Sequence, residues 1–461
     1  MFKMKQGKFN FPIEKKKKQG DTANRRSGFG ITLTPAQSAI FDLVMDGESV
    51  FFTGCAGSGK TAIINILTRS LPLKSTFITA ATGLAAVHIG GSTLHSFAGI
   101  GLGDESKEKM VEKIIGNKWS QKKWLDCRTL IIDEISMVSG ELFDKLEHVA
   151  RAVRGSLDFF GGIQLVISGD FLQLPPVDPS KTEHLAFESE AWKRGIKNVK
   201  LLTEIHRQSE SSFVKVLNNM RLGKISEMDL DILRPCINRV FDPNDIFEPT
   251  RLYATKDEVL KFNTVKLNEL EGKEYRFDAE DKGDNKYWVD YLKKYCMAVD
   301  SLVLKKNAQV LLIKNLDAKK GLVNGSRGII IGFDIKDNDE DEKKKIIHPI
   351  VRFANGLEQI ILRDSWEIKS QGKTVATRVQ TPLILAWSLT IHKCQGMTLE
   401  KGEVSMTRIF EKNQAYTALS RFKSLESLRI TDWAPDTITT CRKAQKFYED
   451  LAKELSQVKI A

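Results

Sequence analysis

The chain has 461 residues, of which 41% are hydrophobic and 28% charged, and its formal net charge is +11 at pH 7. That length allows roughly two to four domains. No apolar run approaches the ~18 residues that a membrane helix needs, so we expect no membrane partner. The six scattered cysteines include no C-x-x-C pair, which argues against a zinc site or a disulfide framework and for a reducing compartment. The positive charge favours a polyanionic partner, with ordinary solubility charge as the alternative.

The first segment, residues 1–30, is basic, polar and poor in aliphatic side chains. A run KKKK at 15–18 is followed by Arg25 and Arg26. We expect a solvated, disordered tail; a nuclear address and an arm that binds phosphates are the alternatives.

The stretch GCAGSGKT, from Gly54 to Thr61, fits the phosphate-loop pattern G-x-x-x-x-G-K-[ST] at every fixed position. A β-prone run at 48–54 precedes it and a helical pattern at 61–71 follows, which is the context that the motif requires. Lys60 would pair with the β- and γ-phosphates and Thr61 would offer its hydroxyl to Mg²⁺, so ATP and Mg²⁺ are the expected ligands. The residues expected to bind nucleotide here are Gly54, Cys55, Ala56, Gly57, Ser58, Gly59, Lys60 and Thr61.

Further polar residues follow predicted buried strands. TLIIDEIS at 129–136 ends in Asp133, which would hold Mg²⁺, and Glu134, which would orient or activate the attacking water. An Asp-Glu pair also closes many ordinary strands, but its place after a phosphate loop favours catalysis. GIQLVISGDFLQLPPV at 162–177 places Gln173 to reach a γ-phosphate or a partner domain. In LTPAQ at 33–37, Thr34 would cap a helix and Gln37 would read adenine; alone, Gln37 would be only a helix residue.

Strands that alternate with helices predict an α/β fold with mainly parallel sheets. We expect a first domain at 31–203 with a small excursion at about 100–125, and a second domain at 204–301 and 381–461. Short strands and Asn-Gly turns at 302–380 predict an inserted small β-barrel, with a charged turn at 337–345. Trp119 and Trp124, in the excursion, would form a wedge or simply pack.

Two arginines far from the phosphate loop are candidate transition-state cations. Arg207 follows a strand in EIHRQ, and Arg421 lies in YTALSRF between a helical run and a strand. Such a cation contributes ~10³–10⁵ in rate to phosphoryl transfer. For either arginine alone a surface ion pair is the simpler interpretation, but the motifs of the first domain favour catalysis.

Two polar segments are candidates for a nucleic-acid groove. LILAWSLTIHKCQGMTLE at 383–400 brings Thr390, His392 and Lys393 to the end of a buried strand. ITAATGLAAVHIGGSTLHSFAGIG at 78–101 combines Thr82 and His95 with small residues and an aromatic on which bases would stack. A glycine-rich connection with a buried phenylalanine explains the second segment equally well.

Together these motifs resemble the petite-integration-frequency (PIF-type) family of DNA helicases, in the 5′-to-3′ subgroup of helicase superfamily one. GCAGSGKT, IIDEISM, GDFLQLPPV, EIHRQ, IHKCQGMTL and YTALSR stand in the family's order from about Leu33 onward, and 142–164 looks like its signature segment. Two departures are Cys394, where the family has serine or threonine, and only about 30 residues before the core, which argues against mitochondrial targeting and against an accessory DNA-binding domain.

The resemblance implies two RecA-like P-loop domains with ATP between them and single-stranded DNA across their top. It assigns catalytic roles to Lys60, Asp133, Glu134, Gln173, Arg207 and Arg421, and nucleotide contacts to the loop and Gln37. The DNA contacts that it implies are Thr82, His95, Phe97, Pro175, Thr390, His392, Lys393, Gln395, Gln414, Tyr416 and Ser420.

From the family we expect an ATP-dependent 5′-to-3′ DNA helicase that unwinds forks, DNA–RNA hybrids and G-quadruplexes in telomere maintenance, replication, repair and recombination. It would act in the nucleus, with a mitochondrial pool as a further option, as a monomer in solution and a dimer on DNA. The alternatives are an ATPase that translocates and strips proteins from DNA without unwinding, and a P-loop kinase or other ATPase that ignores DNA.

Overall fold

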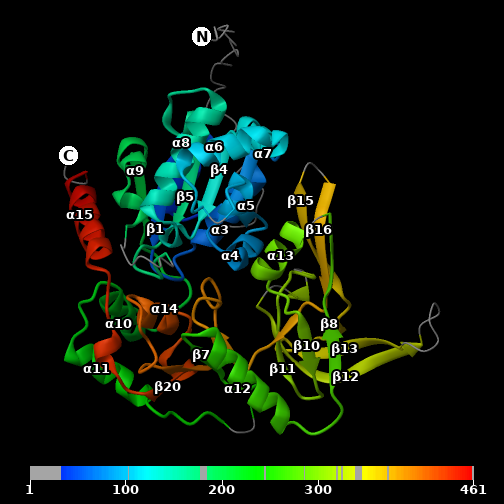
Figure 1. Ribbon diagram of the computed structural model, residues 1–461. Helices are drawn as coiled ribbons and strands as arrows, with labels where there is room; N and C mark the ends of the chain where they lie inside the picture. Colours follow the sequence, from blue (N-terminus) through cyan, green and yellow to red (C-terminus); the bar gives the residue numbers. More distant parts are fainter. Residues whose placement is uncertain are drawn as a thin grey trace.

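The computed structural model describes residues 33–458 except 102, 177–183, 243–244, 285, 318–319, 323–324, 338–344 and 371–372. The tail expected at 1–30 and most of the charged turn expected at 337–345 lie outside the described residues. Within the described part of the chain, no helix combines the length and the apolar character needed to cross a membrane. Two parallel-sheet domains lie one above the other, with a β-rich insert beside them (Figure 1).

The first sheet domain contains six parallel strands in the order β3-β2-β4-β5-β1-β6. Side chains alternate between its two faces, so Phe51 packs into one core while Val50 and Phe52 pack into the other. Helices therefore cover both faces, as a parallel sheet requires. The strands are β1 (Val50–Gly54), β2 (Thr76–Ala80), β3 (Ser92–Thr93), β4 (Thr129–Asp133), β5 (Gln164–Gly169) and β6 (Asn198–Leu202). The helices are α2 (Pro35–Met45), α3 (Lys60–Ser70), α4 (Gly83–His88), α5 (Leu94–Ala98), α8 (Gly140–Arg154) and α9 (Glu190–Gly195).

The excursion in this domain forms α6 (Lys107–Gly116) and α7 (Lys118–Asp126). Trp124 is fully buried in the core, and its indole Nε1 donates a hydrogen bond of 3.1 Å to the carbonyl oxygen of Ala98. Trp119 is only partly covered. The sequence left two interpretations of these tryptophans, a wedge or simple packing. For Trp124 the packing interpretation is correct and the wedge is wrong.

The second sheet domain contains four parallel strands in the order β18-β7-β19-β20. They are β7 (Thr250–Tyr253), β18 (Ser388–Thr390), β19 (Gly402–Ser405) and β20 (Leu428–Asp432). The helices are α10 (Ser211–Arg221), α11 (Glu227–Leu233), α12 (Lys256–Glu269) and α14 (Gln414–Leu419). Together the two domains confirm the α/β fold with parallel-sheet cores.

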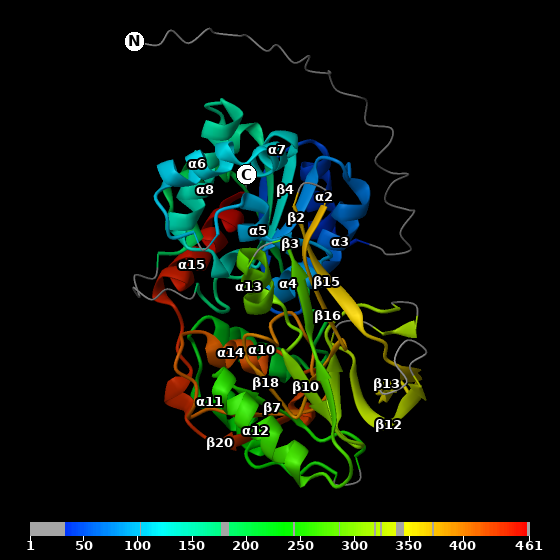
Figure 2. The same cartoon turned by 45° about the vertical axis from the view of Figure 1, so that its right-hand side comes forward.

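The insert begins earlier than the sequence predicts, because β10 pairs with β8 and β16 pairs with β9. Its elements are β8 (Tyr275–Asp278), β9 (Glu280–Gly283), α13 (Lys286–Tyr295), β10 (Ser301–Leu304), β11 (Gln309–Leu312), β12 (Arg327–Asp337), β13 (Lys345–Phe353), β14 (Glu358–Ile360), β15 (Asp364–Ser370), β16 (Lys373–Gln380) and β17 (Leu383–Leu385). The strands form three antiparallel sheets, and no pairing among the described strands closes them into the expected barrel. Figures 1 and 2 both place α13 near α4 of the first domain.

The C-terminal helix, α15 (Arg442–Val458), packs against the first domain. Ala444, Tyr448 and Leu451 belong to the same core as Phe51 of β1. Assigning the whole of 381–461 to the second domain is therefore wrong for this helix. The end of the chain thus returns to the first domain, whose sheet carries the phosphate loop (Figure 2).

Candidate nucleotide site between the two sheet domains

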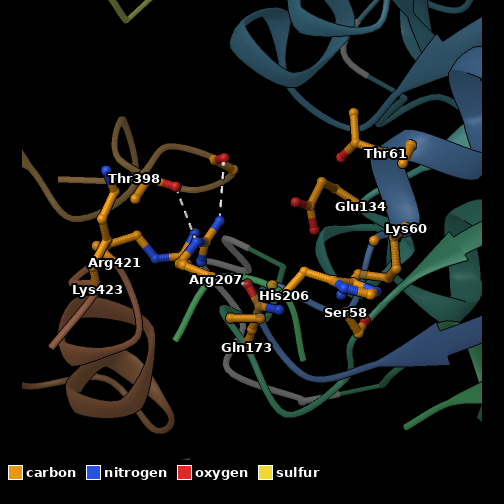
Figure 3. Close-up of a pocket in the computed structure, with 15 residues that line it drawn as sticks. Ser58, Lys60, Thr61, Glu134, Gln173, His206, Arg207, Thr398, Arg421 and Lys423 are labelled. Carbon is orange, nitrogen blue, oxygen red and sulfur yellow. Dashed lines mark hydrogen bonds between the residues drawn. The ribbon is translucent and has the colours of Figure 1, made fainter. Parts of the chain in front are cut away.

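A cleft of about 430 Å³ lies between the two sheet domains and contains the phosphate loop. Residues from both sides line it: Ala56, Gly57, Ser58, Gly59, Lys60, Thr61, Ala62, Glu134, Gln173, His206, Arg207, Gly396, Thr398, Arg421 and Lys423. Figure 3 shows Arg207 and Arg421 across the cleft from Lys60 and Thr61. The structure thus brings together residues that are more than 300 positions apart in the sequence.

The phosphate loop takes a backbone path that favours glycine. Gly57 and Gly59 have φ angles of 82° and 83°, in the left-handed region. A Cβ at Gly57 would lie 2.6 Å from the Cβ of Arg207, and one at Gly59 would lie 2.8 Å from Nε2 of Gln37. The loop ends where α3 begins at Lys60, so the helix N-terminus faces the cleft as an anion site requires.

Lys60 folds over this loop. Its Nζ donates hydrogen bonds of 2.7 Å and 3.0 Å to the carbonyl oxygens of Gly54 and Cys55. Burial lowers the pKa of Lys60, although nearby carboxylates led by Asp170 act to raise it. The ammonium group therefore lies within the loop that it is expected to serve.

Gln37 stands beside the loop, as expected. Its backbone N–H donates to the hydroxyl of Thr34 at 3.3 Å, and its Oε1 accepts from the backbone N–H of Thr34 at 3.1 Å. This capping box confirms the helix start that LTPAQ predicts. Contact with adenine stays a prediction.

The acidic pair emerges at the end of β4. Asp133 is the last residue of the strand, and Glu134 follows with a φ angle of 54°, which turns its carboxylate into the cleft. Burial raises the pKa of both groups, and burial together with the neighbouring Asp133 carboxylate raises the pKa of Glu134 to about 7. A carboxylate that titrates near neutral pH suits a general base.

The residues present fit a Mg²⁺ ion. The hydroxyl of Thr61 lines the cleft, and Asp133 ends the neighbouring strand as a buried carboxylate that is 6% exposed. Hydroxyl and carboxylate oxygens are the protein ligands that Mg²⁺ accepts beside phosphate and water. Their role as ligands stays a prediction.

Arg207 is anchored between the two domains. The backbone N–H of the preceding His206 donates to the carbonyl oxygen of Gly57 at 2.9 Å. The guanidinium of Arg207 donates to the hydroxyl of Thr398 at 3.1 Å and to the carbonyl oxygen of Ser420 at 2.9 Å. Burial and the nearby Arg421 lower its pKa to about 9, so it stays protonated at pH 7.

Arg421 is 1% exposed and is held by groups of both domains. Its Nε donates to the carbonyl oxygen of Thr417 at 2.8 Å, and its Nη2 donates to Oε1 of Gln173 at 3.4 Å. The expected meeting of both arginines and Gln173 in one cleft is therefore found. Their action on a transferring phosphoryl group stays a prediction.

Gln395, an expected DNA contact, reaches the acidic pair of the first domain. Its Nε2 donates a hydrogen bond of 2.9 Å to Oε2 of Glu134, across the cleft. It is 9% exposed. The side chain therefore joins the loop at 390–396 to the expected catalytic carboxylate, and its assignment as a DNA contact stays a prediction.

Five other expected DNA contacts are buried in the protein interior: Phe97, Thr390, Gln414, Tyr416 and Ser420. Phe97 is 1% exposed and packs between Phe77 and Trp124, with ring centroids 5.0 Å from each. Tyr416 is 2% exposed, and its hydroxyl accepts a hydrogen bond of 2.9 Å from the backbone N–H of Ala56 in the phosphate loop. Sequence alone cannot separate an aromatic platform from an aromatic core.

The five remaining expected contacts keep some solvent exposure: Thr82, His95, Pro175, His392 and Lys393. Thr390 is 4% exposed, and its hydroxyl accepts from the backbone N–H of Lys393. Burial lowers the pKa of Lys393, and burial also lowers that of His392. These residues stay candidates for a strand-binding surface above the cleft.

One cluster of buried side chains beside the cleft could not be predicted from the sequence. Arg221 of α10 forms hydrogen bonds of 2.9 Å and 2.7 Å to the two carboxylate oxygens of Asp170, which follows β5. Its guanidinium lies 4.5 Å from the ring centre of Tyr448 in α15. Burial alone would raise the pKa of Asp170, but Arg221 lowers it overall. The carboxylate also accepts from Nε2 of Gln173 at 3.3 Å, so this cluster supports a residue that lines the cleft.

Two family models match the chain. One, described as PIF1-like helicase, matches residues 32–231, and the other, described as the 2B domain of DNA helicase Pif1, matches residues 288–333. A curated relative, the ATP-dependent DNA helicase PIF1 of Xenopus laevis, is 42% identical over 92% of this chain. The chain spans 65% of the length of that relative.

Solved structures extend the likeness to the whole described fold. Pif1 helicase from Candida albicans is 39% identical, with a TM-score of 0.80, and the match covers 91% of this chain and 100% of that one. Pif1 helicase from Bacteroides, in complex with ADP-AlF3 and ssDNA, is 30% identical, with a TM-score of 0.65, over 92% of this chain and 98% of that one. The cleft, the motifs and these matches together show that the chain belongs to the PIF1-like helicase family.

Proposed function

We propose that this protein is an ATP-dependent DNA helicase that moves 5′-to-3′ along single-stranded DNA. The observation that carries the proposal is the shared cleft, in which Lys60 and Glu134 of the first domain face Arg421 of the second. Groups from both domains then act on one phosphoryl transfer, so each turnover changes how the domains are held together. That coupling is what a motor requires.

The residues divide the work by position. Backbone N–H groups of the loop and Lys60 would hold the phosphates. Glu134, with a pKa of about 7, would take a proton from the attacking water. Arg207 and Arg421 would stabilise the charge that develops on the transferred group. Mg²⁺, held by Thr61 and Asp133, would neutralise phosphate oxygens.

The proposed strand path crosses the edge of both sheets above the cleft. It would use Thr82, His95, Pro175, Thr390, His392 and Lys393. The net charge of +11 and the ssDNA in the related Bacteroides structure support a nucleic-acid partner. Polarity rests on the family alone.

Because the chain belongs to this family, we extend the proposal to its substrates and its cellular role. Forked DNA, DNA–RNA hybrids and G-quadruplexes would be unwound, in telomere maintenance, replication, repair and recombination. The protein would act in the nucleus, with a mitochondrial pool as a further option, as a monomer in solution with a dimer on DNA as a further option.

Strand separation on two tailed duplexes tests the proposal. One duplex carries a 5′ single-stranded overhang and the other a 3′ overhang, each incubated with ATP and Mg²⁺, and Lys60→Ala serves as the control. We expect unwinding of the 5′-tailed duplex alone, lost in the variant. DNA-stimulated ATP hydrolysis without unwinding would establish the translocase instead. Hydrolysis that is indifferent to DNA would refute the proposal.

A further inference from the structure

Tyr448 of α15 is a buried side chain that contacts two motifs of the first domain. It is 6% exposed, and burial raises the pKa of its hydroxyl, which therefore stays protonated at pH 7. The hydroxyl shares a hydrogen bond of 2.5 Å with Oγ1 of Thr53, the residue before the phosphate loop. It also accepts a hydrogen bond of 3.2 Å from the backbone N–H of Phe171. One side-chain oxygen thus joins the strand that enters the phosphate loop to the segment that leads to Gln173.

The ring of Tyr448 reaches the second domain. The guanidinium of Arg221, on α10, lies 4.5 Å from the centre of this ring. The same guanidinium binds both carboxylate oxygens of Asp170, the residue before Phe171. Arg221 is 8% exposed, and a contact between a cation and a ring is stronger where water is excluded. Tyr448 therefore holds the backbone of Phe171 directly and the side chain of Asp170 through Arg221.

The contacts continue from Asp170 to the cleft. Nε2 of Gln173 donates to Oδ2 of Asp170 at 3.3 Å, and Oε1 of Gln173 accepts from Nη2 of Arg421 at 3.4 Å. Hydrogen bonds in such dry surroundings strengthen one another, and water does not replace a lost partner. A displacement of the backbone at Phe171 would therefore move Gln173 and loosen its contact with Arg421. The members of this chain of contacts are each at most 8% exposed: Thr53, Asp170, Gln173, Arg221, Arg421 and Tyr448.

The hydroxyl of Tyr448 is not needed to pack α15. Ala444, Phe447 and Leu451 dock the same helix onto the first domain through apolar contacts. Burying a hydroxyl costs free energy, which its hydrogen bonds have to offset. Both of these hydrogen bonds go to segments that enter the site, the strand before the phosphate loop and the segment before Gln173. This arrangement is that of a side chain that orients a site.

We propose that Tyr448 is a positioning residue for ATP hydrolysis. Its hydroxyl fixes the backbone that carries Gln173, and its ring acts on the Gln173 side chain through Arg221 and Asp170. Gln173 in turn orients Arg421, which is expected to stabilise the charge that develops during phosphoryl transfer. The inference rests on the proposed function. It adds to the ATP site a residue of α15 that does not itself line the cleft.

The test compares Tyr448→Phe with wild type in DNA-stimulated ATP hydrolysis. The substitution removes one oxygen and keeps the ring beneath Arg221. We expect kcat to fall about 10- to 100-fold, because a small displacement of a catalytic group costs about that much. KM for ATP should change by less than about twofold, because the contacts that bind the ground state are kept.

Nucleotide affinity supplies the second readout, measured by isothermal titration calorimetry on the same preparations with ssDNA present. The affinity of Tyr448→Phe for ADP with Mg²⁺ should equal that of wild type. Its affinity for ADP with Mg²⁺ and aluminium fluoride should fall by the same factor as kcat, because this complex mimics the transferring phosphoryl group. A purely structural role of the hydroxyl would not separate the two affinities.

Thr250→Val is the matched control. It also removes a buried hydroxyl, which donates at 3.2 Å to the carbonyl oxygen of Ala386, but it lies outside the cleft. Both variants should lower the midpoint of urea denaturation, and only Tyr448→Phe should lower kcat. Arg221→Lys is the second variant should Tyr448→Phe fail to fold. It keeps the charge beside Asp170 but loses the fork, and it should show the same fall in kcat with unchanged ADP affinity.

A kcat of Tyr448→Phe within about twofold of wild type would overturn the proposal, as would a rise in KM with kcat unchanged. An equal fall in kcat in Thr250→Val would overturn it too, because the effect would then follow stability alone. ATP hydrolysis by wild type that is indifferent to DNA would instead refute the proposed function.

Discussion

Glu134 is the side chain in the cleft that we expect to act as the general base. It stands just past a buried strand in the left-handed backbone region, which a non-glycine residue takes only where the surroundings hold it. Nε2 of Gln395 reaches it from the other domain at 2.9 Å. A carboxylate so placed is set apart from its neighbour Asp133 by orientation, and the two can serve different roles.

The titration of Glu134 predicts how ATP turnover depends on pH. Burial and Asp133 raise its pKa to about 7, so the group is protonated and unable to accept a proton below that pH. We expect kcat for ATP hydrolysis to rise between pH 6 and 8 with a midpoint of about 7. Steady-state hydrolysis across this range measures it. Glu134→Gln should lose about 10²–10⁴ in kcat and the pH step with it; a variant that keeps the step would contradict the assignment.

At the scale of elements, α10 and α15 are held to the first sheet by buried polar contacts. Arg221 of α10 pairs with Asp170, and the hydroxyl of Tyr448 in α15 shares a hydrogen bond of 2.5 Å with Thr53 of β1. It also accepts from the backbone N–H of Phe171 at 3.2 Å. Segments far apart in the chain thus support the strand that leads into the phosphate loop.

The buried pair predicts a large loss of stability. Arg221→Ala would leave the fully buried Asp170 carboxylate without its partner, and we expect the free energy of unfolding to fall by about 3–5 kcal/mol. Arg234→Ala is the matched control, because Arg234 also pairs with two carboxylates but is 56% exposed, and it should cost no more than about 1 kcal/mol. Urea denaturation compares them; equal losses in the two variants would contradict the argument.

The sequence predicts the elements that local patterns define. The phosphate loop, the capped helix at Thr34 and the strand before Asp133 each depend on a few neighbouring residues, and each is found. Strands β8 and β9 were not predicted, because a segment such as EDKG has no apolar alternation and pairs only through its tertiary partners. Nor could the position of Tyr416 be predicted, since its contact with Ala56 joins residues 360 positions apart.

At the scale of the molecule, the two sheet domains meet through the residues of the site itself. Tyr416 contacts the phosphate loop, Gln395 contacts Glu134, and Arg421 contacts Gln173. Each contact joins a side chain of the second domain to a motif of the first. A change in the cleft therefore acts directly on the loop at 390–396, whose other residues are expected to bind the strand.

The central claim is that the second domain completes the ATP site of the first. The most direct measurement is the rate of DNA-stimulated ATP hydrolysis by Arg421→Lys, with ssDNA affinity measured on the same preparation. Lysine keeps the charge but loses the fork that meets Gln173 and would meet the phosphoryl group. We predict a fall in kcat of about 10³ or more with DNA affinity unchanged. A kcat within about tenfold of wild type would contradict the account.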